Sequence, residues 1–396
     1  MKNILIIDGF PPPHKWLRNS NHHVTWLSYP EEIRPYEYHR IITIDSILEN
    51  NIEIINVLHT QNPFDYIYCF RERSMELTYR LSEHLKVPSN SNHNISKINN
   101  KYEMRVFQEN NSFKYAIINN YEDLKKGIIK TKYPAILKPI DGFASQNVYK
   151  INNESELQNN WINFSKDNKI GILEEFIFGK EYSIEVISIN NIHKIIGITK
   201  KYKNQNFVEI GHSFPKVFPN LLEEKIKSFI VSLLDKLNVN DGISHTEIII
   251  TEQQNIQLIE THLRPPGDCI PILIKEALNF DIFDYFLTNT LIHNTHTDIN
   301  IEPKNIHSAI WFKTSDVQGK VISIINQNDD NNMNFIEFYK FKNVNDFITP
   351  TSSSLDRLCY VISKGPTSKQ AIDSCKDYLD KVFYILQTKD NKIVVV

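Results

Sequence analysis

Short apolar runs alternate with amphipathic stretches over the first part of the chain. The apolar runs are typical of buried strands, whereas the stretches between them, 47–58 and 75–85, have helical spacing. Strands that alternate with helices form parallel sheets, so this pattern predicts an open, doubly wound α/β domain. We expect its strands at 4–7, 24–27, 41–44 and 66–70.

The pattern changes near residue 94, where extended segments become longer and helices fewer. A helix at 222–237 and a hairpin of 242–251 with 256–263 follow, with the polar segment 252–255 as the turn. The tail from 307 has short strands and a closing helix near 368–386. We therefore expect three domains, 1–93, 94–214 and 215–396. The middle one has strands at 135–138, 147–151 and 170–176 and a hairpin around 190–191.

Composition excludes several classes of protein. The 44 basic and 47 acidic residues give a net charge of −3, which offers no clustered positive face for a nucleic acid. No apolar stretch is long enough to cross a membrane, and the four cysteines lie far apart without a C-x-x-C pair. We expect a soluble, cytoplasmic protein. The turn Asp8-Gly9-Phe10-Pro11 lacks the G-x-G-x-x-G pattern, which disfavours a dinucleotide-binding domain.

Lys138 ends the apolar run 135–138 and is followed by the polar, partly small segment 141–145. A lysine in an apolar run needs an anionic partner, and small residues let backbone N–H groups approach phosphate oxygens. A phosphate site and a solvated lysine before a surface turn are both consistent with this segment.

Glu247 and Glu260 lie on the two arms of the expected hairpin, among apolar neighbours. Two carboxylates that face one cleft repel each other unless a cation lies between them, and Mg²⁺ prefers such oxygen donors. Arg264 falls on the same face as Glu260 if the strand continues, where it could stabilise a transferring phosphoryl group. A purely structural ion pair is the alternative.

Taken together, these segments resemble the ATP-grasp superfamily from about residue 101 to 387. The resemblance makes Lys101 and Lys138 the phosphate-binding lysines, and it makes Glu247 and Glu260 the metal ligands, with Arg264 steadying an acyl-phosphate. The segment 172–181 looks like the hinge that holds adenine. The implied ATP-binding residues are Lys101, Lys138, Ser145, Glu174, Glu175, Ile177 and, at the ribose, Glu181.

Within the superfamily, the segment 207–215 resembles the L-amino acid ligase branch, as do the triplet His245-Thr246-Glu247 and the tail 356–365. This resemblance places Glu209 and His212 near the substrate, together with Arg264. Asp268 follows Arg264 closely, and it could pair with a substrate ammonium or cap the next helix.

One departure concerns the metal-site motif, which usually reads Glu-x-Asn-x-Arg. Here His262 stands at the Asn position, and imidazole is a poor ligand for Mg²⁺.

The resemblance implies an ATP-grasp fold with a Rossmann-like N-terminal domain, a lid lobe and a C-terminal metal-binding domain. It further implies a ligase that uses ATP and two Mg²⁺ ions, with Mn²⁺ as a substitute, to join a small carboxylate to an amine. The expected substrates are amino acids, and the resemblance is compatible with a homodimer. Two alternatives remain. One is a carboxylase or nucleotide-pathway ligase that phosphorylates bicarbonate. The other is an ATP-binding module without turnover.

Overall fold

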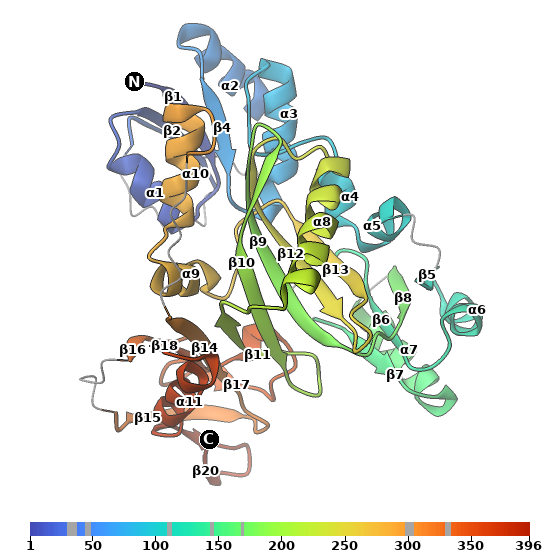
Figure 1. The fold of residues 1–396 in the computed structure, drawn as a ribbon. Coiled ribbons are helices and arrows are strands. Elements are labelled where there is room, and N and C mark those ends of the chain that lie inside the picture. Colours follow the sequence, from blue (N-terminus) through green and yellow to red (C-terminus); the bar gives the residue numbers. More distant parts are fainter. Residues whose placement is uncertain are drawn as a thin grey trace.

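The computed structural model describes residues 1–29, 38–43, 49–108, 113–142, 146–167, 170–297, 305–328 and 334–396 (Figure 1). The candidate ATP-binding residue Ser145 lies outside these ranges, together with 143 and 144. Residues 44–48, which include the end of one expected strand and the start of one expected helix, also lie outside them.

The N-terminal part is a parallel four-stranded sheet with helices, as the alternating pattern predicts. Strand β1 is buried along its whole length, as is usual for a parallel strand covered on both faces. The strand order β3-β2-β1-β4 is that of an open α/β sheet. Its elements are β1 (Asn3–Ile7), α1 (Pro11–Arg18), β2 (His23–Ser28), β3 (Arg40–Thr43), α2 (Glu49–Gln61), β4 (Tyr66–Cys69), the short helix η1 (Glu72–Ser74) and α3 (Met75–Leu85).

A small lobe follows, with an antiparallel sheet in the order β5-β8-β6-β7 and an apolar core of its own. The expectation of few helices between 94 and 214 is wrong. Helix α7, for example, buries only Leu157 and Phe164, so its apolar stripe is too sparse to stand out in the sequence. The elements are α4 (Ile95–Asn99), α5 (Lys101–Gln108), β5 (Tyr115–Ile118), α6 (Tyr121–Thr131), β6 (Ala135–Pro139), β7 (Tyr149–Ile151), α7 (Glu154–Asp167) and β8 (Gly171–Glu175).

The centre of the molecule is an eight-stranded antiparallel sheet in the order β13-β12-β9-β10-β11-β14-β18-β16. Both expected hairpins are present, and Asn190 and Asn191 turn the first with positive φ angles. The strands are β9 (Lys180–Ile189), β10 (Ile192–Lys203), β11 (Glu209–Phe214), β12 (Gly242–Ile250), β13 (Ile256–His262), β14 (His307–Lys313), β16 (Phe335–Lys340) and β18 (Cys359–Gly365).

Helices connect this sheet to the N-terminal part. Figure 1 shows α10 beside the N-terminal sheet, where Phe283 and Phe286 pack edge-on against Phe70. No helix among the described residues is long and apolar enough to span a bilayer. The helical elements of this part are α8 (Asn220–Lys236), α9 (Ile270–Leu278), α10 (Ile282–Thr288) and the π-helical turn η2 (Asn289–His293).

The C-terminal part adds a further four-stranded sheet, β17-β15-β19-β20, and the helix α11. The expected closing helix is too long, because α11 ends at Leu379 and the following residues form β19. In β19, buried side chains alternate with more exposed ones, which is the period of a strand that pairs with β15. The elements are β15 (Gly319–Asn326), β17 (Phe347–Ile348), the short helix η3 (Ser354–Asp356), α11 (Ser368–Leu379), β19 (Val382–Gln387) and β20 (Ile393–Val395).

Candidate active site

A cavity of about 1460 Å³ lies between the N-terminal part, the small lobe and the central sheet. It is lined by the segment after β4, by strands β6 and β8 of the lobe, and by β10, β12 and β13. Every site residue expected from the sequence within the described ranges lines this cavity. Residues that are far apart along the chain therefore share one cleft.

Glu247 and Glu260 face each other across β12 and β13, where the strand register pairs them directly. Burial raises the pKa of each carboxyl group, but the surrounding lysines and histidines outweigh it and hold both pKa values well below the usual range. Two ionised carboxylates at one position of a hairpin are hard oxygen donors. The donor set therefore fits a divalent cation such as Mg²⁺.

Lys138 and Lys101 lie close to this pair and belong to different elements. The Lys138 ammonium is 2.7 Å from Glu174 Oε2, and Arg105 Nε donates to Glu174 Oε1 at 2.7 Å. Burial opposes the ionised form of Glu174, yet Arg105 and Lys138 lower its pKa to about 2. Glu174 thus holds Lys138 in place. The expected contact of Glu174 with the adenine base of ATP stays a prediction. Lys101 Nζ donates to the Gly142 carbonyl at 2.6 Å and lies 3.4 Å from Glu260 Oε2.

The expected hinge, 172–181, runs from β8 into the start of β9, and Glu175, Ile177 and Glu181 line the cavity there. The Glu181 carboxylate forms an ion pair with Lys203 of β10. The Glu175 side chain instead accepts a hydrogen bond from the backbone N–H of Lys114, which ties the hinge to the lobe. The roles assigned to these residues in nucleotide binding stay predictions.

His262, at the position where Asn is usual, contacts the proposed metal ligand Glu260. Its Nε2 lies 3.1 Å from Glu260 Oε1, and its Nδ1 lies 3.2 Å from Oε2 of Glu72. Arg264 follows the end of β13, and its Nε donates to the same Glu72 oxygen at 2.9 Å. Burial raises the pKa of Glu72, but His262 and Arg264 lower it to about 2. Glu72 therefore reaches from the N-terminal part to fix both residues, and the sequence interpretation missed it.

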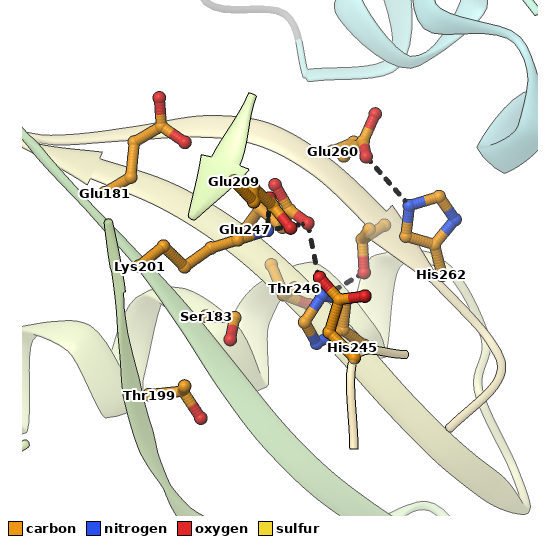
Figure 2. Close-up of polar contacts among 12 residues, drawn as sticks. Glu181, Ser183, Thr199, Lys201, Glu209, His245, Thr246, Glu247, Glu260 and His262 are labelled. Atoms are coloured by element: carbon orange, nitrogen blue, oxygen red, sulfur yellow. Dashed lines mark hydrogen bonds and ion pairs between the residues drawn. The ribbon is translucent and has the colours of Figure 1, made fainter. Parts of the chain in front are cut away.

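Lys201 of β10 lies between two carboxylates (Figure 2). Its ammonium is paired with Glu247 and lies 2.6 Å from Glu209 Oε1. The Glu247 oxygen that pairs with Lys201, Oε1, also lies 3.2 Å from His245 Nε2, and His245 Nδ1 is 2.8 Å from Glu185 Oε2. Burial disfavours the charged imidazole, but the two carboxylates raise the pKa of His245 to about 9. Lys201 and Glu185 were also missed, although alternate lysines at 201 and 203 on one strand face were a usable signal.

Asp268 does not cap α9. The N-cap of that helix is Cys269, which has no side-chain cap bond. Both Asp268 oxygens accept hydrogen bonds from Arg357, at 2.6 and 2.8 Å, and Oδ2 lies 3.0 Å from His212 Nε2. Glu209, His212 and Asp268 are close enough to hold a metal ion, but Arg357 and Lys201 already neutralise the two carboxylates.

Comparison with protein families identifies the class of this fold. Residues 131–272 match the model of the ATP-grasp domain family. The chain therefore contains an ATP-grasp domain, and its mixed α/β architecture is the ATP-grasp fold. A search of curated protein sequences found no significant match.

Solved structures resemble the chain over nearly its whole length. L-amino acid ligase from Bacillus licheniformis superposes with a TM-score of 0.80 at 18% sequence identity, covering 98% of this chain and 99% of that one. N5-carboxyaminoimidazole ribonucleotide synthetase from Thermotoga maritima gives a TM-score of 0.70 at 17% identity, covering 96% and 99%. The biotin carboxylase domain of 2-oxoglutarate carboxylase from Hydrogenobacter thermophilus gives 0.68 at 15%, covering 100% and 91%. At these identities the likeness establishes the fold.

Proposed function

We propose that the chain is an ATP-dependent ligase that joins a carboxylate to an amine and releases ADP and phosphate. The observation that carries this proposal is the meeting of two lysines, two facing carboxylates and an arginine in one cavity of an ATP-grasp fold. Each of these groups can bind or stabilise the negative charge of a transferring phosphoryl group, directly or through a metal ion. A phosphoryl group moving from ATP to a carboxylate gives an acyl-phosphate, which an amine can then attack.

The roles of the residues follow from their contacts. Lys138, held by Glu174, and Lys101, held by Gly142, present ammonium groups to the nucleotide phosphates. A Mg²⁺ ion held by Glu247 and Glu260 would neutralise charge on the transferring phosphoryl group. Because Glu72 fixes Arg264, the Arg264 guanidinium is preorganised to stabilise the oxyanion that forms when the amine attacks the acyl-phosphate.

The substrates we propose are amino acids. The solved L-amino acid ligase has the highest TM-score of the three structures compared, and the partly buried cluster of Glu209, His212 and Asp268 offers carboxylate oxygens as acceptors for an α-ammonium group. The small lobe borders the cavity through β6 and β8 and can cover the nucleotide, which would protect an acyl-phosphate from water.

A carboxylase that phosphorylates bicarbonate is the second candidate, because a biotin carboxylase domain and an N5-carboxyaminoimidazole ribonucleotide synthetase share the fold. In that case the substrate acid needs no ammonium site. The partly buried cluster around Asp268 therefore favours the amino acid ligase.

The deciding experiment measures ADP release by the purified protein with MgATP and pools of amino acids, with product masses read in parallel. We expect a pool-dependent signal and a product mass equal to two components less water, both absent in Glu260→Gln. ADP release that depends on bicarbonate would favour the carboxylase. Nucleotide binding without ADP release from any acid and amine would leave the non-catalytic module as the explanation.

A further inference from the structure

Lys201 occupies a place in the cleft that the reaction outlined above does not use. Its side chain is only 2% exposed, and it projects from the middle of the central sheet, because β10 pairs with β9 on one side and β11 on the other. The neighbouring Lys200 leaves the strand on the opposite face, where its ammonium lies 4.5 Å from the centre of the Tyr202 ring. The two adjacent lysines therefore have different surroundings.

The two carboxylates that Lys201 joins belong to different halves of the site. Glu247 is on β12, and Glu209 is on β11, and two strands separate β12 from β11 in the sheet. Glu247 is the proposed metal ligand, whereas Glu209 belongs to the proposed substrate cluster, with its Oε2 3.6 Å from His212. One ammonium thus spans the sheet and connects the metal half to the substrate half (Figure 2).

We propose that Lys201 is a positioning residue that acts as a resident counter-ion. Its ammonium group pairs with Glu247 while no metal is bound, and it shifts towards Glu209 when a divalent cation binds to Glu247. This inference rests on the proposed metal role of Glu247 and Glu260.

The physical basis is competition for one carboxylate. An ammonium group paired with Glu247 must give up that contact, or tolerate a nearby double positive charge, when a metal ion binds. Glu209 compensates for this loss, because it offers Lys201 a second carboxylate within hydrogen-bond distance. Lys201 therefore weakens the binding of a bare metal ion. Nucleotide phosphates that arrive with the metal bring the negative charge that lets both cations remain.

Two substitutions should change metal affinity in opposite directions. Lys201→Met removes the competing cation, so we expect Mn²⁺ to bind at least about tenfold more tightly. Glu209→Gln leaves Lys201 with Glu247 as its one carboxylate, so we expect Mn²⁺ to bind several-fold more weakly. Lys201→Arg keeps the charge and should bind Mn²⁺ as the unchanged protein does. Lys200→Met, on the other strand face, is the matched control and should also leave the affinity unchanged.

The measurement is a titration of the full-length protein with Mn²⁺ alone, without nucleotide, following the free-ion signal by electron paramagnetic resonance. Circular dichroism checks that each variant is folded. An unchanged or weaker affinity in Lys201→Met, or an unchanged or tighter one in Glu209→Gln, overturns the proposal. If Lys201→Met does not fold, the Glu209→Gln and Lys201→Arg titrations still decide. Because the titration involves no turnover, it is independent of the ADP assay, which tests the ligase activity itself.

Discussion

Replacing Asp268 by Asn removes the carboxylate that pairs with the buried Arg357, without straining the backbone. Asp268 has a φ of 49°, a left-handed conformation that Asn tolerates well. Its partner Arg357 is 6% exposed, donates to both Asp268 oxygens and lies 3.7 Å from the centre of the Phe312 ring. Leaving one charge of a buried pair without its partner costs about 3–5 kcal/mol. We therefore expect Asp268→Asn to lower the free energy of unfolding by roughly 3 kcal/mol or more.

The assay is chemical denaturation followed by tryptophan fluorescence, since Trp311 lies next to Phe312 on β14. Asp373→Asn is the control, because Asp373 forms an ion pair with Lys369 on the surface of α11, where such pairs are worth about 0–1 kcal/mol. A similar effect of Asp268→Asn and Asp373→Asn would refute the reasoning.

A double substitution tests the same pair from the other side. Removing both charges, as Asp268→Asn with Arg357→Met, leaves no unpaired buried charge, so the double variant should be more stable than Asp268→Asn alone. If the losses of stability caused by the two single substitutions instead add up in the double variant, the Asp268–Arg357 ion pair does not account for them. An increased KM for the amine or the acid substrate in Asp268→Asn would further support its place in the substrate site.

Four other outcomes follow from the structure. Glu260→Gln should abolish ADP release while circular dichroism shows an intact fold, because the proposed metal site loses a carboxylate. Lys138→Met should weaken ATP binding about tenfold or more in a fluorescence titration, and an unchanged affinity would contradict its phosphate role. Burial lowers the pKa of His14 from 6.5 to about 4. Protonation of His14 is therefore less favourable in the folded protein than in the unfolded chain. This difference contributes about 3 kcal/mol to the free energy of unfolding above pH 6.5, and the contribution should be lost as the pH falls towards 4. The His14→Gln variant should not show this loss. A Cβ on Gly211 would lie 2.2 Å from Trp311 Cε3, so Gly211→Ala should lower stability by about 1–3 kcal/mol in denaturation experiments.

Regular, strongly periodic segments were predictable. The parallel N-terminal sheet was visible because its strands are short runs of buried apolar residues between helices. The sequence also placed Glu247 and Glu260 on the two arms of a single hairpin, and the strand register of that hairpin pairs them directly. The predicted closing helix was too long, because apolar residues continue from α11 into β19 and only the pairing of β19 with β15 decides where the helix ends.

Most contacts that complete the candidate site could not be read from the sequence. Glu72 and Arg264 are 192 positions apart, and Asp268 and Arg357 are 89 apart. No local period relates such residues, because their meeting depends on how the N-terminal part and the C-terminal strands pack against the central sheet. The same holds for Lys201, whose partners are brought to it by the order of the strands.

The sequence by itself determined the strongly periodic strands and helices and which residue types could bind phosphate and metal, because those signals depend on neighbours along the chain. Tertiary structure decided which charges are paired. A buried lysine, arginine or carboxylate must find an opposite charge, and the sheet order rather than the spacing sets which one lies within reach. Asp268 illustrates the difference: its position suggested a helix cap or a substrate contact, whereas the fold binds it to Arg357 and His212.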